Sequence, residues 1–308
     1  MAFTGAISPN VVKTALDDVF FTEYEDMGPM LAHADDEMVF RQSTADSGAV
    51  IMEVFKGVKA WEQRSESADV NQDSPLVGDQ ITYSVLNYAN SVDISKNLFD
   101  DNKHDVVKNM MREFAEKARV AQDKNAYGLF RNGFGTTLTA DGAALYSNTH
   151  TTLSGDTVDN LGTATLSETS LNTGIIALAE QVDQAGEIRG HQATCLLVPP
   201  ALFKTACEIA GSEWRSGTAN NDDNVYLSKY GIYVKQSQYL GAAAGGSDTA
   251  WFLSSKNHSN YRWVRDGIAT DLVEYKYQRN NDYIYKGEYR EMVGAVTYEG
   301  SWASNGTV

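Results

Sequence analysis

The chain has 308 residues, of which 42% are hydrophobic, and its formal net charge is −16. This length can bury one large core or two of ordinary size, and the acidity argues against sequence-specific binding of nucleic acid, which usually needs a basic protein. No apolar run approaches the roughly 20 residues that span a bilayer, and the first residues lack the pattern of a secretory signal. We therefore expect a soluble protein with no membrane partner.

The charge is unevenly distributed along the chain. Residues 1–101 contain 6 Lys and Arg against 18 Asp and Glu, a balance of −12, whereas residues 102–131 contain 7 against 4, a balance of +3. Acidity commonly serves solubility alone, but opposite charges on one chain can also meet on neighbouring copies. A local basic face can still contact nucleic-acid phosphate without reading its sequence.

The first 95 residues predict an arm followed by a ribbon. Residues 1–45 mix short apolar pairs with acidic clusters and show no sustained period, so we predict an extended arm. Residues 48–63 and 79–94 have the composition and alternation of two strands, with a projecting polar tip at 64–78. Because a two-stranded ribbon is only marginally stable alone in water, we expect this one to need a partner surface.

A long helix is predicted over residues 102–130. Its apolar residues recur at helical spacing and form a single stripe, and Gly128 and Gly133 are expected to end it. Away from the stripe, Lys108, Arg112 and Arg119 line up as a basic row. Such a row is typical of a solvated face, and contact with nucleic-acid backbone is the sharper alternative.

The rest of the chain mixes helices and strands, which predicts an α+β fold. A capping box at Thr165 and Glu168 precedes a core helix that Gly186 closes, and a buried strand at 193–198 leads through two prolines into another helix. The last third predicts strands, among which 268–279 and 282–298 form an antiparallel pair with a turn at 279–282. The predicted strands are residues 231–236, 250–254, 261–265, 268–279 and 282–298.

Catalytic signatures are missing from the sequence. Gly133 and Gly135 begin a glycine-rich pattern, but the third glycine and the preceding strand of a phosphate loop are lacking. The five histidines have no ligand spacing, and Cys195 and Cys207 form no C-x-x-C motif. We therefore predict no catalytic residue, no cofactor site and no metal site. Because the members of a catalytic triad can be far apart in sequence, a cytoplasmic α+β binding protein or enzyme stays the alternative of a different class.

The order of these elements resembles the major capsid protein of tailed bacteriophages, which has the Hong Kong 97-like fold. Local runs add to the resemblance: 145–150 (LYSNTH), 160–162 (NLG), 166–171 (LSETSL) and 196–202 (LLVPPAL). The resemblance implies an N-terminal arm, an extended two-stranded loop, a long spine helix, a peripheral sheet and an α/β axial domain. The implied boundaries are 1–47 for the arm, 48–95 for the loop, 96–185 for the peripheral domain with the spine helix at about 102–130, 186–261 for the axial domain, and 262–308 for peripheral strands and the C-terminus.

The resemblance also implies a function and partners. The chain would be a non-enzymatic structural subunit that assembles with copies of itself, as hexamers and pentamers, into an icosahedral head around double-stranded DNA. A separate scaffolding protein and a portal would be partners, with cement proteins as optional ones, and assembly would take place in the host cytoplasm before the protein resides in the virion. The family's spine helix lies near the inner surface, so Lys108, Arg112 and Arg119 would face packaged DNA. A phage tail or decoration protein is the alternative within this class.

Overall fold

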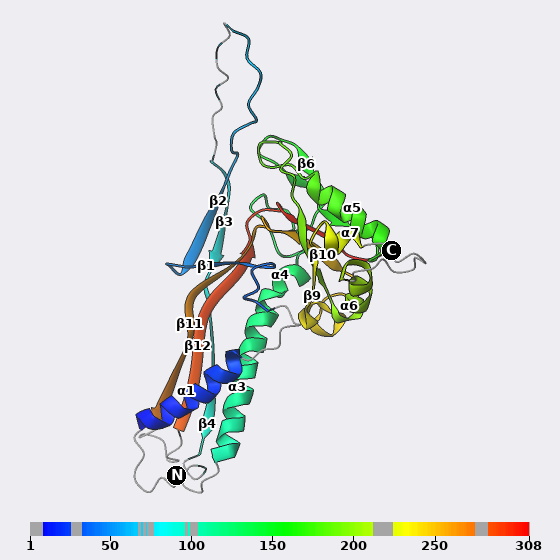
Figure 1. The fold of residues 1–308 in the computed structure, drawn as a ribbon. Coiled ribbons are helices and arrows are strands. Elements are labelled where there is room, and N and C mark those ends of the chain that lie inside the picture. Colours follow the sequence, from blue (N-terminus) through cyan, green and yellow to red (C-terminus); the bar gives the residue numbers. More distant parts are fainter. Residues whose placement is uncertain are drawn as a thin grey trace.

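The computed structural model describes residues 9–25, 33–66, 69, 72, 77–95, 98, 104–211, 224–274 and 283–307. The described chain forms an elongated lobe and a compact lobe, and a narrow two-stranded ribbon projects away from both (Figure 1). The strands of the described residues form a four-stranded sheet, a five-stranded sheet, the ribbon and one small hairpin.

The four-stranded sheet has the strand order β1-β11-β12-β4. Its centre is the antiparallel pair of β11 and β12, which confirms the predicted pairing of the last long strands. The predicted strands 261–265 and 268–279 are joined in one strand, β11, whose register shifts between Val264 and Ala269. The predicted turn at 279–282 lies outside the described residues. The strands are β1 (Arg41–Thr44), β4 (Leu86–Ile94), β11 (Asn260–Glu274) and β12 (Tyr283–Ala295).

Two helices cover this sheet. The predicted long helix is present as α3 (His104–Ala126), followed by the short α4 (Gly128–Arg131), and its apolar stripe buries Val107, Met111 and Phe114. The prediction of an extended arm is wrong for residues 9–25, which form the helix α1 (Pro9–Glu25). Leu16 and Phe20 of α1 are buried in one apolar cluster with residues of α3 and the sheet. Because they are four residues apart, a helix places both on the same face, and burial of that face stabilises α1.

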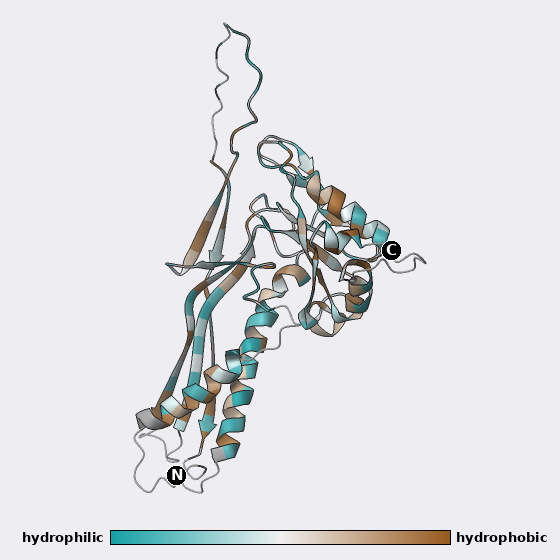
Figure 2. Cartoon of the chain, viewed as in Figure 1, coloured by the Kyte–Doolittle hydropathy of each residue, from teal (hydrophilic) through white to brown (hydrophobic). Residues whose placement is uncertain are grey.

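The ribbon consists of β2 (Ala49–Phe55) and β3 (Val77–Ser84), which pair only with each other. The prediction of one strand over 79–94 is wrong, because Val85 interrupts it and β4 pairs with β12 in the other sheet. β2 also ends earlier than the predicted strand over 48–63. The predicted tip at 64–78 lies largely outside the described residues. Figure 2 shows hydrophobic residues along β2.

The compact lobe contains the five-stranded sheet β7-β13-β10-β8-β9. The predicted strand at 193–198 and the helix after the two prolines are confirmed as β8 and α6. The capping box lies at Ser167 and Ser170 and corrects the predicted Thr165 and Glu168. The elements are β5 (His150–Thr151), β6 (Thr157–Val158), β7 (Leu161–Gly162), α5 (Glu168–Ala179), β8 (Ala193–Val198), α6 (Pro200–Ala206), α7 (Val225–Ser228), β9 (Tyr233–Gln236), β10 (Trp251–Ser255) and β13 (Ser301–Ser304).

The last strand departs from the predicted grouping. Residues 262–308 were expected to lie with the peripheral strands, but β13 pairs with β10 and β7 in the five-stranded sheet. Trp302 of β13 packs against Trp251 of β10, with ring centroids 5.0 Å apart, in the core between the sheet and α5. The chain therefore leaves the elongated lobe after β12 and returns to complete the compact lobe.

Candidate assembly surfaces

The ribbon has one covered and one exposed apolar face. Along β2, Val50, Met52 and Val54 face the body and belong to a cluster with Trp263 and Met292. The alternate residues point away from the body, as the two-residue period of a strand requires. Five apolar side chains are exposed here, and we call them the ribbon stripe: Ile51 (57% exposed), Phe55 (58%), Val58 (61%), Trp61 (101%) and Val77 (61%).

The ribbon stripe is an unusual surface for an isolated chain. Phe55 lies opposite Val77 across the ribbon, so the two side chains form one exposed apolar pair. Trp61 projects entirely into solvent beyond the end of β2. Clustered apolar side chains on a projecting element mark a protein interaction site more often than an isolated exposed residue does. The ribbon therefore offers a contact surface.

The structure divides the predicted basic row of α3. Lys108 and Arg112 are exposed, and Arg112 lies 3.7 Å from Glu23 of α1. Arg119 corrects the prediction of an exposed row, because its side chain is buried and pairs with Asp35 at 2.5 Å. The helical spacing contained this signal: Arg119 follows Met111 by eight positions and Ala115 by four, which puts it on the buried face.

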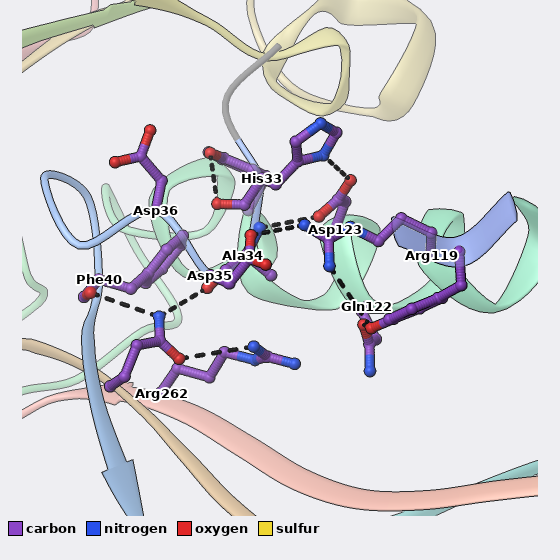
Figure 3. A network of polar contacts seen from close by, with 12 residues as sticks. His33, Ala34, Asp35, Asp36, Phe40, Arg119, Gln122, Asp123 and Arg262 are labelled. Carbon is purple, nitrogen blue, oxygen red and sulfur yellow. Dashed lines mark hydrogen bonds and ion pairs between the residues drawn. The ribbon is translucent and has the colours of Figure 1, made fainter. Parts of the chain in front are cut away.

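Arg119 is part of a polar network that fastens the segment after α1 to the body (Figure 3). Asp123, one turn further along α3, accepts a hydrogen bond from the Ala34 backbone N–H at 2.8 Å. The same carboxylate lies 2.9 Å from Nδ1 of His33. The guanidinium of Arg119 also lies over the ring of Tyr24, 5.4 Å from its centroid. α3 therefore holds both the end of α1 and the segment that follows it.

The same network extends into the four-stranded sheet. Gln42 donates to the Ala34 carbonyl at 2.9 Å, and Arg262 of β11 donates to Gln42 Oε1 at 3.5 Å. Arg262 in turn pairs with buried Glu291 of β12 at 2.6 Å. We call this group the polar clamp: His33, Ala34, Asp35, Gln42, Arg119, Asp123, Arg262 and Glu291. It was missed from sequence because its members come from four separate segments.

Charge and burial oppose each other at the polar clamp. Burial by itself would raise the pKa of the Asp35 carboxyl, but the hydrogen bond and charge of Arg119 outweigh it and lower that pKa. At Glu291 burial prevails, so its pKa is raised although Arg262 pulls in the other direction. Both carboxyls already have a guanidinium partner. The clamp therefore links the segment after α1 to α3, β11 and β12 through paired charges and hydrogen bonds.

Neither a metal site nor a membrane span is found in the part of the chain that the structure describes. No group of three or more His, Cys, Asp or Glu side chains there is placed to hold a metal ion. No helix among these residues is long and apolar enough to cross a membrane. An open pocket of about 600 Å³ lies between β3, α4 and β12, and its buried carboxylate, Glu291, is the one that Arg262 neutralises.

Comparison with known proteins gives a family and a fold. A model of the family described as phage capsid protein matches residues 78–303. Among curated protein sequences, none matches this chain. Three solved structures are similar over most of their length, at identities that show the fold alone.

These structures come from an archaeon and two phages. The virus-like particle of Pyrococcus furiosus is 10% identical with a TM-score of 0.56, covering 94% of this chain and 98% of its own. The mature capsid of bacteriophage PhiM1 is 14% identical with a TM-score of 0.55, and the match covers 99% of this chain and 90% of the PhiM1 chain. The capsid of Myoviridae phage XM1 is 11% identical with a TM-score of 0.52, and the match covers 91% of this chain and 94% of the XM1 chain. The predicted α+β, Hong Kong 97-like capsid fold is thereby confirmed.

Proposed function

Because the chain belongs to the phage capsid protein family and is a structural subunit of a phage capsid shell, we propose that its ribbon joins neighbouring copies through the ribbon stripe. The exposed Phe55 and Val77 pair and the fully exposed Trp61 carry this proposal. The ribbon's other face is already covered by its own body, so the remaining apolar area is free for a second copy. Burial of such area is the main driving force of protein association.

The test is assembly of a ribbon variant. Phe55→Ser combined with Trp61→Ser removes apolar area without touching the covered face, so the subunit should fold but fail to form shells. Ile188→Ser is the control, since Ile188 is a large apolar residue that is also exposed (67%) but lies away from the ribbon. Size-exclusion light scattering and negative-stain microscopy measure the outcome. Shells of normal yield from the ribbon variant would overturn the proposal.

We extend the proposal to the organisation of the shell. Copies would meet as hexamers and pentamers, because a closed shell repeats one heterologous contact around five-fold and six-fold positions. The elongated lobe would be the peripheral domain, the compact lobe the axial domain, and the segment before β1 the arm. The separation of the two lobes and the projection of the ribbon support this division (Figure 1).

For the shell's interior, we propose that Lys108 and Arg112 face packaged double-stranded DNA. Both are exposed on α3, whereas Arg119 leaves the proposal because its side chain is buried. Contacts of this kind would reduce the repulsion between the acidic protein and the DNA phosphates without recognising the DNA sequence. Lys108→Gln with Arg112→Gln should lower the DNA content per head and leave shell yield unchanged, and Lys204→Gln on α6 is the exposed control. Equal DNA content in all three preparations would contradict the proposal.

The remaining partners follow from family membership alone. We propose a separate scaffolding protein, a portal and, as optional partners, cement proteins, with assembly in the host cytoplasm. Co-expression with the scaffolding protein of the same phage should raise the fraction of uniform closed shells. Shells equally uniform without it would contradict that part of the proposal.

A further inference from the structure

The ribbon is attached to the body by short backbone connections. Residues 45–48 link β1 to β2, and Val85 alone separates β3 from β4. At this base, the Ala45 N–H donates to the Val264 carbonyl at 3.1 Å, and the Val85 N–H donates to the Gly48 carbonyl at 2.9 Å. The second of these bonds lies within the ribbon's own end, so side chains are needed to fix the ribbon's angle to the body.

Tyr83, near the end of β3, makes such a contact. Its hydroxyl donates to the Ala295 carbonyl at 2.7 Å and accepts from the Ala295 N–H at 3.1 Å. A neighbouring strand makes this same pair of bonds, so the side chain takes the place of a strand at the end of β12. Its ring packs on Trp263 of β11, with centroids 5.5 Å apart. Burial raises the pKa of Tyr83 to about 12, so the hydroxyl keeps its proton at neutral pH.

Gly294 provides the room for this ring. A Cβ at this position would lie 2.4 to 2.8 Å from three ring atoms of Tyr83, closer than side chains tolerate. The glycine is therefore required by the close approach of the ring, as glycines within strands often are. Any side chain at Gly294 would push Tyr83, and the ribbon with it, away from β12.

A second contact lies further out on the same strand. A Cβ at Gly78 would lie 2.2 Å from a methyl carbon of Leu153, in the turn between β5 and β6. The Leu153 N–H donates to Gln184 Oε1 at 3.3 Å, which ties that turn to the segment after α5. Gly78 and Tyr83 are about 17 Å apart along the strand, at roughly 3.4 Å per residue. Because these two contacts are separated along β3, together they restrict the direction of the ribbon as well as the position of its base.

We infer that Tyr83 is a positioning residue: together with Gly294 and Trp263 it sets the direction in which the ribbon projects, and hence where the ribbon stripe meets the next copy. The geometry stands on the contacts within one chain. The consequence for assembly rests on the proposed function of the ribbon. A change of a few degrees at the base moves the far end of the ribbon most, so shell diameter should respond to it.

The direct test is a distance distribution between two spin labels, measured by pulsed electron resonance. One label is attached through Glu53→Cys, at an exposed position of β2, and one through Lys204→Cys on α6, in a Cys207→Ser background because Cys207 is partly exposed. Labelled subunits are diluted in unlabelled ones, so that distances within one chain dominate. The intact chain should give one narrow distribution.

The variants separate the role of the ring from that of the hydroxyl. Gly294→Ala should shift or broaden the distribution, and Tyr83→Phe, which keeps the ring and loses the hydrogen bonds of the hydroxyl, should broaden it less. Tyr88→Phe is the control, since Tyr88 of β4 stacks on Tyr289 within the four-stranded sheet. If Gly294→Ala fails to fold, Tyr83→Phe decides alone. A broad distribution in the unmodified chain, or identical distributions in all variants, would overturn the inference.

Shell diameter then separates the two proposals. Variants with a shifted ribbon should form shells of altered or mixed diameter when imaged by electron microscopy. A shifted distribution with shells of unchanged diameter would support Tyr83 as a positioning residue and overturn the ribbon as the joint between copies. An unchanged distribution would overturn the positioning role whatever the shells look like.

Discussion

The five-stranded sheet and the ribbon bury their strands to very different degrees. Every residue of β10 and β13 is buried, whereas in β2 only Val54 is. Helices α5 and α6 of the same chain pack against the sheet. The ribbon has one face on its own body and one face in solvent. One chain thus contains a sheet whose strands are buried within the chain and a ribbon that leaves one apolar face exposed.

Two tryptophans give the largest expected contrast between these regions. Trp302→Ala empties the core beside Trp251, so we expect it to lower the free energy of unfolding by about 3–5 kcal/mol. Trp61→Ala, at a fully exposed position on the ribbon, should change it by no more than about 0.5 kcal/mol. Urea denaturation of the dissociated subunit measures both. Similar losses of unfolding free energy in the two variants would contradict the difference in burial between the sheet and the ribbon.

Substitution of a buried and an exposed arginine of α3 should change the free energy of unfolding by an intermediate amount, and it compares buried with exposed positions a second time. Arg119→Met removes a buried guanidinium from the polar clamp, and because the Asp35 side chain is 55% exposed, water screens part of this pair; we therefore expect a loss of about 1–2 kcal/mol in the free energy of unfolding. Arg112→Met removes only an exposed pair with Glu23 and should cost at most about 0.5 kcal/mol. The same denaturation series tests both. Equal losses would mean that the clamp contributes no more than a surface ion pair.

The smallest effect concerns Asp17, which fastens α1 to the elongated lobe. Its carboxylate accepts hydrogen bonds from Tyr285 at 2.7 Å and Thr270 at 2.8 Å. Burial would raise its pKa, but these bonds and Lys13 outweigh burial and lower it. The stabilisation is therefore present above the unfolded pKa of about 3.9 and is lost as pH falls through the lower folded pKa.

Asp17→Asn should consequently lower the free energy of unfolding by about 1 kcal/mol at pH 7. The difference from the unmodified chain should shrink as the pH is lowered below about 4, because the native carboxyl then becomes neutral as well. Denaturation at a series of pH values measures this. Asp18→Asn, one residue away at an exposed position of α1, is the control. A difference that stays constant with pH would show that charge is not the cause.

Elements with a strong local period were predicted from the sequence. The apolar stripe of α3, the buried run of β8 before its proline-started helix, and the alternating final strands all depend on neighbours within a few positions. The absence of recognisable catalytic motifs also indicated a structural protein, in agreement with the family that the chain belongs to. These features are local, so propensity and spacing are enough to read them.

Pairings between distant segments were not predictable in this way. α1 is helical because Leu16 and Phe20 find a surface on α3 and β12, and Arg119 is buried because Asp35 lies opposite it. Nothing near Val85 shows that β3 belongs to the ribbon and β4 to another sheet, because both strands alternate alike.

The amino-acid sequence by itself thus determined the order and type of most elements, the acidic N-terminal third and the family resemblance. Only the tertiary structure decided which charged residues are exposed, which strands share a sheet, and how Tyr83 meets Gly294. The physical reason is that local spacing fixes which face of an element is apolar. Which partner covers that face depends on contacts between residues as far apart as 83 and 295.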